Sequence, residues 1–551
     1  MFGAVRVWRR GFGACAVRCL SRPLVAGTML GLGLIGCTST VRIATPDEQH
    51  VIDRKYVEYP SDFEFRRFAT GFTAATAMAF DSDYSALFVA EGERGEEPRI
   101  WRVPVNGSKL SLVYPAGGRL PLPFPTPAWR MFGPIGGMVV LPDGKIIVTH
   151  RDENDLGVIT ALDRKGGHKT IVAGFPTQGD NGLTDLAVNP RTGELWFGCG
   201  TATNSGVVGA DNWSTGWLRY HPEVHDIPWR DIELLGYKFQ SFNPFAGIFG
   251  PGDVAVTAPF QPFNQSFAIR VPGSPVGKPN GAIYSVSPNG GIPTVKAHGI
   301  HNPRGIAIDD YGQPYFTSAG MEMRGARPIK DDPDALLRLP TFVAWFGWPD
   351  FTADLNRVSD PKYQPPQDMI AGTGYPEVRP LIDRDASGGL TPASREQYLE
   401  AAFPSLSGAG KMGFVPLTWR KEFQRSIIVT LSGDRSPFAS GGIKLPRHVG
   451  SKIVRVDLDH HVDLDHHVVY DFIRNTSGLP GSSTPGSGTP GGRNYDLIER
   501  PVDVKFGPDG VMYILDMGRM EVRNGRERYE TGSAQIYRLV PINEPTTKPK
   551  G

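Results

Sequence analysis

The chain has 551 residues and a formal net charge of +1, so it lacks the basic excess that nucleic-acid binding needs, and we expect no nucleic-acid partner. Its 67 Gly and 49 Pro predict a domain of strands and turns, because so many of these residues would interrupt long helices. The clearest helix that we expect is short and covers Ser394–Ala402.

The first 36 residues are typical of an export signal. They carry five Arg and no acidic residue, and they end in the apolar run Leu24–Gly36, which is too short for a permanent membrane helix. Leu34-Ile-Gly-Cys37 resembles the lipobox of bacterial lipoproteins, where cleavage before the Cys leaves it acylated. We therefore expect a lipoprotein signal peptide at 1–36, a tether at 37–62, and a lipid on Cys37. This lipid would anchor the exported protein to a membrane of the cell envelope, on the periplasmic or cell-surface side.

Other interpretations of this segment stay open. Arg9-Arg-Gly-Phe12 also resembles a twin-arginine export signal, and the whole segment could instead be a buried N-terminal helix, although its clustered Arg argue against that. Loss of the signal would remove Cys15 and Cys19 and bring the net charge to about −4. With Cys37 acylated, Cys199 would remain alone, so we expect no intrachain disulfide.

A strand–turn–strand unit recurs along the rest of the chain. Its six copies cover Met78–Val89, Met138–Val148, Leu186–Phe197, Ala297–Gly320, Leu417–Val429 and Val504–Ile514. Three of them are followed by a strand of the form Ile-x-Arg-Val or Ile-x-Arg-Leu, at Ile100, Ile453 and Ile536. Six such units suit a radial arrangement, and they predict an all-β fold, a six-bladed β-propeller over 63–540. Two stacked β-sandwich domains are the alternative.

Several long segments contain no copy of this unit. We expect 201–280 and 340–415 to be loop insertions on one face of the propeller, where binding surfaces are usually built. Residues 477–492 consist mainly of Gly, Ser, Thr and Pro and predict a flexible loop, and 541–551 would be a C-terminal tail. Val456–His467 contains Val-Asp-Leu-Asp-His-His twice, which favours an exposed hairpin end, with metal binding as the alternative.

Three polar residues, His301, Asn302 and Arg304, stand directly before the first apolar strand of the fourth copy. If the copies are blades, the ends of their strands meet at one mouth. The cluster therefore predicts a site that several blades share.

Four groups of residues are together similar to the motifs of one family. They are Gly299-Ile-His-Asn-Pro-Arg-Gly305, then Gly347-Trp-Pro-Asp350, then Gly433-Asp-Arg-Ser-Pro437 with Gly450-Ser-Lys-Ile-Val-Arg-Val456, and finally Arg500-Pro-Val-Asp-Val504 with Gly507-Pro-Asp-Gly510. The four groups also follow one another in the family's order, and on these residues the chain resembles the glucose/sorbosone dehydrogenase family. The resemblance implies a six-bladed propeller whose mouth holds pyrroloquinoline quinone (PQQ), with calcium ions for structure and cofactor binding. It also implies oxidation of a sugar or aldehyde by hydride transfer.

The chemistry that the resemblance implies needs a base for the substrate hydroxyl proton. At the position of the family's catalytic His this chain has Asn181, which cannot act as a base. Its neighbour Asp180 can, although a carboxylate before a turn often only accepts backbone hydrogen bonds. His301 is the base that we expect, with packing beneath a loop as its alternative role.

Cations are needed to hold the carboxylates of the implied cofactor. Where the family has Arg in its fourth-blade motif this chain has His301, so Arg304 is expected to supply the charge, unless it pairs with Asp309. Asn302 is expected to bind the cofactor beside it. Arg500 matches a cofactor-side Arg, with a salt bridge to Glu499 or Asp503 as its alternative role. The family's Lys on the fifth blade has no match, and Arg435 is expected to replace it.

Calcium is expected near Gly320 and Met321, where the family supplies backbone carbonyl ligands. Asp331, Asp332 and Asp334 are alternative ligands, or form a solvated acidic loop. Trp348 is expected in the core rather than in the site.

The function that we expect is a membrane-anchored quinoprotein-type oxidoreductase. Its partners would be a sugar or related aldehyde or alcohol, an external electron acceptor, and the membrane through the N-terminal lipid. Two alternatives come from other classes. The first is a cofactor-free envelope propeller that binds carbohydrate or protein. The second is a calcium-dependent lactonase-like hydrolase, since six-bladed propellers host that chemistry too.

Overall fold

A computed structural model describes residues 41–94, 97–115, 129–246, 252–274, 277–385, 388, 390–461, 467–484, 496–523 and 526–542. The contacts divide the chain into Met1–Thr38 and Ser39–Gly551, and everything below concerns the second unit. The expected signal at 1–36, the lipid site Cys37, the second half of the loop 477–492 and nearly all of the tail 541–551 lie outside the described residues. Within those residues no helix is long and apolar enough to cross a membrane.

Six sheets of four or five strands account for most of the structure, and each forms one blade. The first blade contains β4 (Ala75–Phe80), β5 (Ala86–Glu91), β6 (Arg99–Pro104) and β7 (Ser111–Tyr114). The second contains β8 (Met138–Val140), β9 (Ile146–Arg151), β10 (Gly157–Leu162) and β11 (His168–Phe175). The third contains β12 (Leu183–Val188), β13 (Leu195–Cys199), β18 (Ala282–Val286), β19 (Thr294–His298) and β23 (Ala344–Trp345).

The strands of the other three blades all pair antiparallel, whereas in the third blade β23 pairs parallel with β19. The fourth contains β20 (Asn302–Ile308), β21 (Pro314–Ala319), β22 (Pro333–Arg338) and β25 (Leu399–Ser405). The fifth contains β26 (Ala409–Phe414), β27 (Ser426–Leu431), β28 (Lys452–His461), β29 (His467–Asn475) and β2 (Val57–Glu58). The sixth contains β30 (Pro501–Phe506), β31 (Met512–Asp516), β34 (Ala534–Pro541), β3 (Phe63–Phe72) and β1 (Arg42–Ile43).

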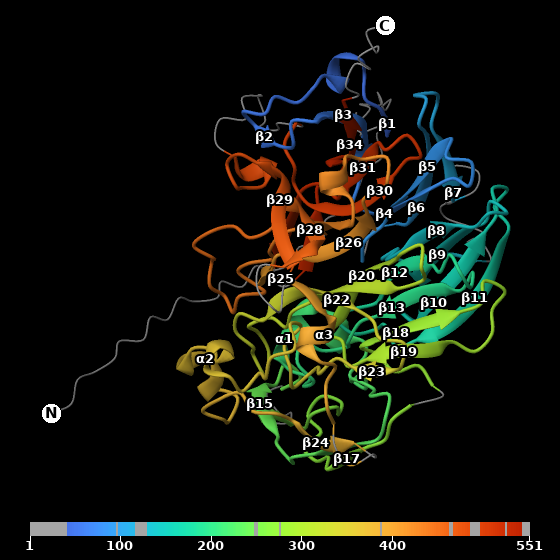
Figure 1. The fold of residues 1–551 in the computed structure, drawn as a ribbon. Coiled ribbons are helices and arrows are strands. Elements are labelled where there is room, and N and C mark those ends of the chain that lie inside the picture. The colour runs from blue at the N-terminus through green and yellow to red at the C-terminus, as the bar shows by residue number, and fades with distance from the viewer. Residues whose placement is uncertain are drawn as a thin grey trace, which may run out of the picture. The chain divides into compact units, whose positions relative to one another are not determined.

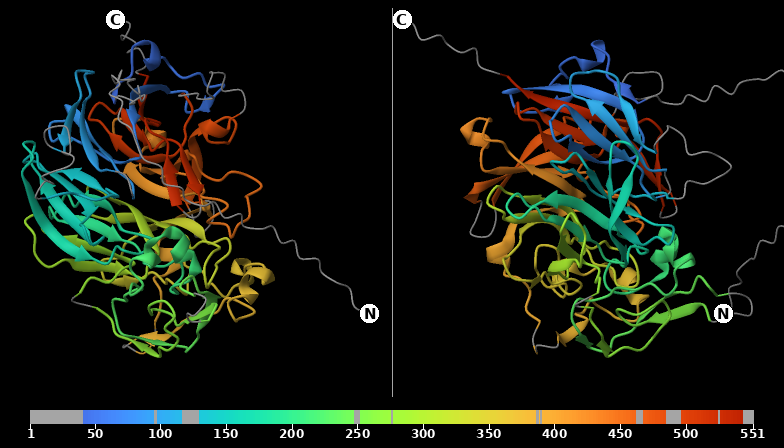
Figure 2. Two further views of the ribbon diagram at one scale, coloured as in Figure 1. Left: turned by 180° about the vertical axis from the view of Figure 1, so that it is seen from behind. Right: turned by 90° about the vertical axis from the view of Figure 1, so that its right-hand side faces the viewer.

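The six blades close into a ring. Their first strands, β4, β8, β12, β20, β26 and β30, are neighbours in that order, and β30 lies beside β4 again. Figure 1 shows these strands around a common centre. The sixth blade joins the two ends of the propeller, because β3 pairs with β34, with Phe65 opposite Leu539, and the blue and red strands lie together in both views of Figure 2. The prediction of a six-bladed propeller is confirmed, and the β-sandwich alternative is wrong.

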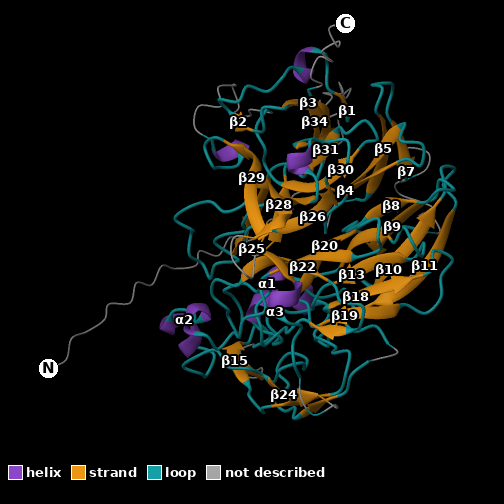
Figure 3. Cartoon of the chain, viewed as in Figure 1, coloured by secondary structure: helices purple, strands orange, loops and turns teal. Residues whose placement is uncertain are grey.

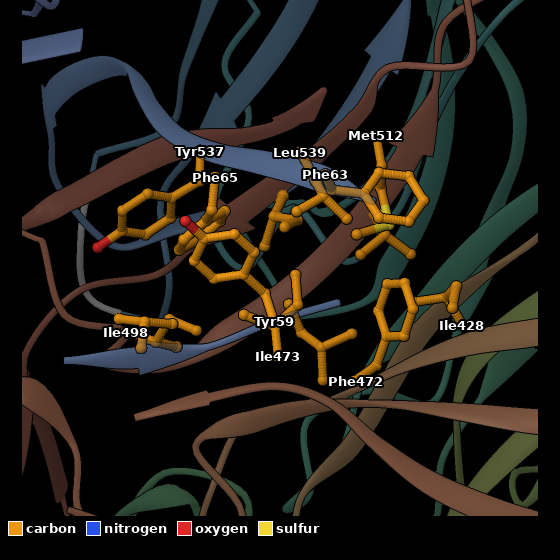
Figure 4. Packing of buried hydrophobic residues seen from close by; sticks show 14 of the residues in the cluster. Tyr59, Phe63, Phe65, Ile428, Phe472, Ile473, Ile498, Met512, Tyr537 and Leu539 are labelled. Carbon is orange, nitrogen blue, oxygen red and sulfur yellow. The ribbon is translucent and has the colours of Figure 1, made fainter. Parts of the chain in front are cut away.

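Apolar side chains between neighbouring blades form the core. Between the fifth and sixth blades, the rings of Phe65 and Tyr537 stack with centroids 4.9 Å apart, and Phe63 and Phe472 pack edge to face (Figure 4). Every residue of the central strand β27 is buried, because neighbouring blades cover both faces of each sheet. This explains why the inner strands have almost continuous apolar sequences.

The fifth repeat differs from its predicted position. Leu417–Val429 was expected to be the hairpin, but the first strand is β26 at Ala409–Phe414, and only β27 was placed correctly. Small residues hide β26 in the sequence. They are needed at the centre of the ring, where a side chain on Gly305 would collide with the backbone oxygen of Gly410 in the next blade.

Three other segments differ from expectation. In place of a helix over Ser394–Ala402, α3 covers Arg395–Tyr398 and the chain continues as the outer strand β25, so tertiary pairing overrides the local helix preference. The segment expected as a tether contacts the propeller where it is described, since β1 pairs with β3 and β2 pairs with β29. Val456–His467 lies in the hairpin of β28 and β29, whose tip, 462–466, is outside the described residues.

The two long insertions associate with each other, and Figure 3 shows that they are mostly loop. The first contains α1 (Ala210–Thr215), β14 (Ile232–Leu234), β15 (Phe239–Phe242), β16 (Val254–Thr257) and β17 (Arg270–Val271), and the second contains α2 (Gln367–Ala371) and β24 (Ile382–Asp385). They join in the sheet β17–β14–β24. The segment Thr215–His221 of the first insertion reaches the cavity described next.

Candidate active site

A cavity of about 640 Å³ opens at the centre of the ring. Each blade contributes to it from its first strand or from the segment just before that strand, for example Thr76, Gly136, Thr184, Arg304, Lys411 and Val502. Its lining has nine basic and six acidic side chains. The cavity is therefore shared among the blades, as the position of the polar cluster predicted, and its charge suits an anionic ligand.

His301 is buried beside the cavity as a neutral imidazole. Its Nδ1 lies 3.1 Å from the backbone oxygen of Ala319, and because a carbonyl can only accept, Nδ1 carries the proton. Nε2 is buried and has no hydrogen-bond partner within the described part of the chain. Burial lowers the pKa of His301 to about 4, so at neutral pH it is a weak base.

Asp180 is held in a dense set of hydrogen bonds. Its carboxylate accepts from Trp217 Nε1 at 2.7 Å, from Thr215 Oγ1 at 3.0 Å and from Asn212, and it pairs with Arg324 at 2.8 Å. Burial alone would raise its pKa, but Arg324 and these donors hold the pKa below its usual value. The structure therefore gives Asp180 a structural role and leaves it few lone pairs for a substrate.

Asn181 and Asn302 bridge the third and fourth blades at the cavity wall. Asn302 Nδ2 donates to Asn181 Oδ1 at 2.8 Å, and Asn181 Nδ2 donates to the backbone oxygen of Thr201 at 3.1 Å. Asn302 Oδ1 is buried and accepts no hydrogen bond from any described residue. It is an acceptor beside the cavity that a ligand would satisfy.

A network of buried ion pairs forms another part of the wall. Arg324 contacts Asp180, Asp211 and Glu322, and Arg435 pairs with Glu322 at 3.0 Å and with Glu527 at 2.8 Å. Arg435, which was expected to replace a missing Lys, thus has two carboxylate partners already, and they raise its pKa.

Arg304 and Lys411 are cations of the cavity without an acidic partner among the described residues. Arg304 makes no ion pair or hydrogen bond there, and the expected alternative, a pair with Asp309, does not form. Lys411 Nζ donates to the backbone oxygen of Thr76 at 2.7 Å. Lys411 lies in β26, the first strand of the fifth blade, which we expected eight residues later in the sequence, at Leu417.

Arg500 also lines the cavity, where it supports a loop. Its guanidinium donates to the backbone oxygens of Ser432 and Gly433, both at 3.1 Å, and of Asp434 at 2.9 Å. It does not pair with Glu499 or Asp503. Its hydrogen-bond partners are thus three backbone carbonyls and no carboxylate, and burial lowers its pKa against the smaller effect of nearby acidic groups such as Glu527.

Glu93 is an acidic residue of the cavity that sequence reasoning missed. It follows β5 in the first blade, and its carboxylate accepts a hydrogen bond from the backbone of Arg94 at 3.2 Å. Burial and the nearby charge of Glu527 raise its pKa, against a smaller effect of Arg304 and Lys411. A carboxylate with a raised pKa at a cavity has the properties of a general base.

The backbone N–H groups of the expected calcium site are engaged. Gly320 donates to Asp334 at 2.9 Å and Met321 donates to Asp332 at 2.7 Å, and burial raises the pKa of both carboxyls. The side chain of Met321 lies in an apolar cluster, and Asp331 is exposed. No three His, Cys, Asp or Glu side chains gather as metal ligands in the described ranges, and calcium at this point stays a prediction.

Trp348 lies in the same apolar cluster as Met321 and is 6% exposed, which agrees with its expected place in the core. Its Nε1 donates to the backbone oxygen of Asn204 at 3.2 Å. Trp348 therefore offers no open ring face to a ligand.

Comparison with known proteins gives weak similarities. No family model and no curated protein sequence matches the chain. Among solved structures, the holo PQQ domain of a pyranose dehydrogenase from Coprinopsis cinerea is 13% identical, with a TM-score of 0.47 over 88% of this chain and 97% of that one. The PQQ-bound aldose sugar dehydrogenase from Streptomyces coelicolor is 13% identical, with a TM-score of 0.43 over 88% and 99%.

A third similar structure is the calcium structure of a Trichoderma reesei protein of Carbohydrate-Active Enzymes Family AA12. It is 14% identical, with a TM-score of 0.47 over 91% of this chain and all of that one. Such values do not by themselves assign an activity to this chain, so its chemistry has to be argued from its own residues.

Proposed function

We propose that the protein is a quinoprotein-type oxidoreductase that oxidises a sugar, or a related aldehyde or alcohol, with PQQ bound in the central cavity. The proposal includes an anchor to a membrane of the cell envelope through a lipid on Cys37, and an external electron acceptor. The observation that carries it is the cavity with Arg304, a cation that forms no ion pair or hydrogen bond with any described residue.

The residues of the cavity fit this cofactor. PQQ is a planar anion with several carboxylates, and its quinone, when bound, accepts a hydride from the substrate carbon. Arg304 and Lys411 would hold the carboxylates, and the buried polar atoms without partners, Asn302 Oδ1 and Thr76 Oγ1, mark further contact points. Their unpaired donors and acceptors are arranged before a ligand enters, which favours binding.

The proton of the substrate hydroxyl needs a base, and Glu93 fits this role better than His301. The carboxylate of Glu93 lines the cavity and has a raised pKa, whereas His301 has a lowered pKa and a buried Nε2. A raised pKa makes a carboxylate a stronger base, whereas a lowered pKa makes an imidazole a weaker one. We infer that Glu93 takes the proton.

One alternative has a specific observation in its favour. Asp180 and Arg435, both expected in the site, are already held in ion pairs, which suits a propeller that binds carbohydrate or protein without a cofactor. The lactonase-like alternative depends on calcium and stays a prediction.

The purified mature protein, mixed with PQQ and Ca²⁺, is expected to oxidise at least one member of a panel of aldoses, sugar acids and aldehydes. The measurement is dye-coupled turnover, with PQQ-free protein as the control. Binding of sugar without turnover by the PQQ-loaded protein would favour the cofactor-free alternative, and hydrolysis of lactones without PQQ would favour the hydrolase.

Replacing Arg304 by Gln is expected to weaken PQQ binding by about tenfold, because a charged hydrogen bond to a carboxylate contributes roughly 1.5 kcal/mol or more. The measurement is a calorimetric titration of the apo protein with PQQ. Arg191→Gln, in the turn between β12 and β13 and away from the cavity, is the matched control. Equal affinities of the Arg304 variant and the native protein would remove Arg304 from the cofactor site.

A further inference from the structure

A second cationic feature of the cavity lies on the first and second blades. Arg151, at the end of β9, is 3% exposed and lines the cavity. Its Nε and Nη1 are buried and have no hydrogen-bond partner among the residues described. The nearest carboxylate oxygen, on Asp155, is 3.9 Å from Nη1, and that side chain is 46% exposed. A buried guanidinium whose nitrogens lack hydrogen bonds is costly to the protein unless a ligand satisfies them.

Arg94 adds a second guanidinium at this place. Its Nη2 donates to the backbone oxygen of Gln178 at 3.1 Å, and no carboxylate forms an ion pair with it in the described part of the chain. Burial lowers the pKa of both residues, that of Arg151 to about 9, and the charge of Arg94 contributes to the lowering at Arg151. An anion placed between them would relieve both the desolvation and the repulsion.

The pair belongs to the substrate side of the cavity. Arg94 directly follows Glu93, the inferred base, so the anion site and the base lie on consecutive residues. Arg151 Nη2 lies 3.3 Å from the place of a side-chain carbon on Gly182, next to Asn181. Arg304 and Lys411, which suit the cofactor, come from the fourth and fifth blades.

We propose, resting on the proposed function, that the substrate is a sugar with an acidic group, a carboxylate or a phosphate, and that Arg151 and Arg94 bind this group. The planar guanidinium donates two parallel hydrogen bonds to either acid, which would satisfy the nitrogens of Arg151 that lack partners.

The test compares glucuronate, glucose 6-phosphate and glucose as substrates of the PQQ-loaded protein, native and Arg151→Gln. We expect a higher kcat/KM for one of the acidic sugars than for glucose, and which of them is preferred identifies the acid as carboxylate or phosphate. Arg151→Gln is expected to lower kcat/KM for the preferred acidic sugar by about 10- to 100-fold, the effect of a lost charged hydrogen bond. It should change kcat/KM for glucose by less than about twofold. Arg151→Lys should retain part of the preference, and Arg191→Gln should retain all of it.

Separate measurements keep the outcomes distinct. Thermal unfolding of Arg151→Gln should stay close to that of the native protein, because the one carboxylate within ion-pair distance, on Asp155, is 46% exposed and would remain solvated. A preference for glucose that the substitution does not change would overturn this proposal and leave the proposed function intact. A loss of PQQ affinity as large as the loss for the acidic sugar would also overturn it, by assigning Arg151 to the cofactor.

If no sugar is oxidised, the proposed function fails. Calorimetric binding of glucuronate or glucose 6-phosphate that depends on Arg151 would then still support the anion site, and its absence would overturn it.

Discussion

Replacing Glu93 by Gln is expected to lower kcat by about 100- to 10,000-fold, the usual contribution of a general base. The amide has nearly the same shape but cannot take the hydroxyl proton. KM is expected to change little, because the substitution removes an interaction that matters in the transition state. The measurement is dye-coupled turnover with saturating PQQ.

The pH dependence gives an independent readout for Glu93. Burial and Glu527 raise its pKa, and only the ionised carboxylate is a base, so kcat/KM of the native protein should rise with pH through this raised value. Glu93→Gln should lack that rise. Glu97→Gln, on an exposed carboxylate that pairs with Arg130, is the matched control and should behave like the native protein. Unchanged turnover in Glu93→Gln would return the role of base to His301.

Replacing Arg324 by Gln is expected to lower the free energy of unfolding by about 3–5 kcal/mol, as measured by urea denaturation. The side chain is 6% exposed and contacts the carboxylates of Asp180, Asp211 and Glu322. Its loss would leave three buried carboxylates with one fewer cation, and the desolvation of each would no longer be offset.

Acid should weaken the same network. Burial would raise the pKa of Glu322, but Arg435 and Arg324 hold it below the usual value of 4.5. A group with a lowered folded pKa stabilises the fold above its unfolded pKa and loses that contribution as the pH falls. Stability should therefore fall on acidification below about 4.5, and less steeply in the variant. Arg270→Gln is the control, since Arg270 is 73% exposed in its pair with Glu233, and its loss should lower the free energy of unfolding far less than the loss of Arg324. Equal losses of unfolding free energy in Arg324→Gln and Arg270→Gln would show that the network does not stabilise the fold.

Much of the fold could be predicted because each hairpin carries its own turn. Asp143-Gly144 and Asp509-Gly510 mark tight turns in which the Gly has a positive φ, and such signals depend on neighbouring residues alone. The first strand of the fifth blade could not be predicted, for the opposite reason. Its first strand is rich in Gly because neighbouring strands crowd it at the centre, and crowding between residues far apart in sequence leaves no local pattern.

The residues alone predicted the site where polar side chains are clustered in the sequence, and the family resemblance added Arg435 and Arg500, which also line the cavity. His301, Asn302 and Arg304 drew attention as a cluster, and all three line the cavity. Glu93 and Arg151 lie in segments with several other charged residues. What distinguishes them is the raised pKa of Glu93 and the missing hydrogen bonds of Arg151. Both properties arise from groups on other blades, so they cannot be read from the residues nearby.

The most direct test of the account is a calorimetric and spectroscopic titration of the purified mature protein with PQQ in the presence of Ca²⁺. The account predicts saturable, equimolar binding that Arg304→Gln weakens, and reduction of the bound quinone when an oxidisable sugar is added. Absence of binding by the correctly folded protein would contradict the assignment of the central cavity to a quinone cofactor.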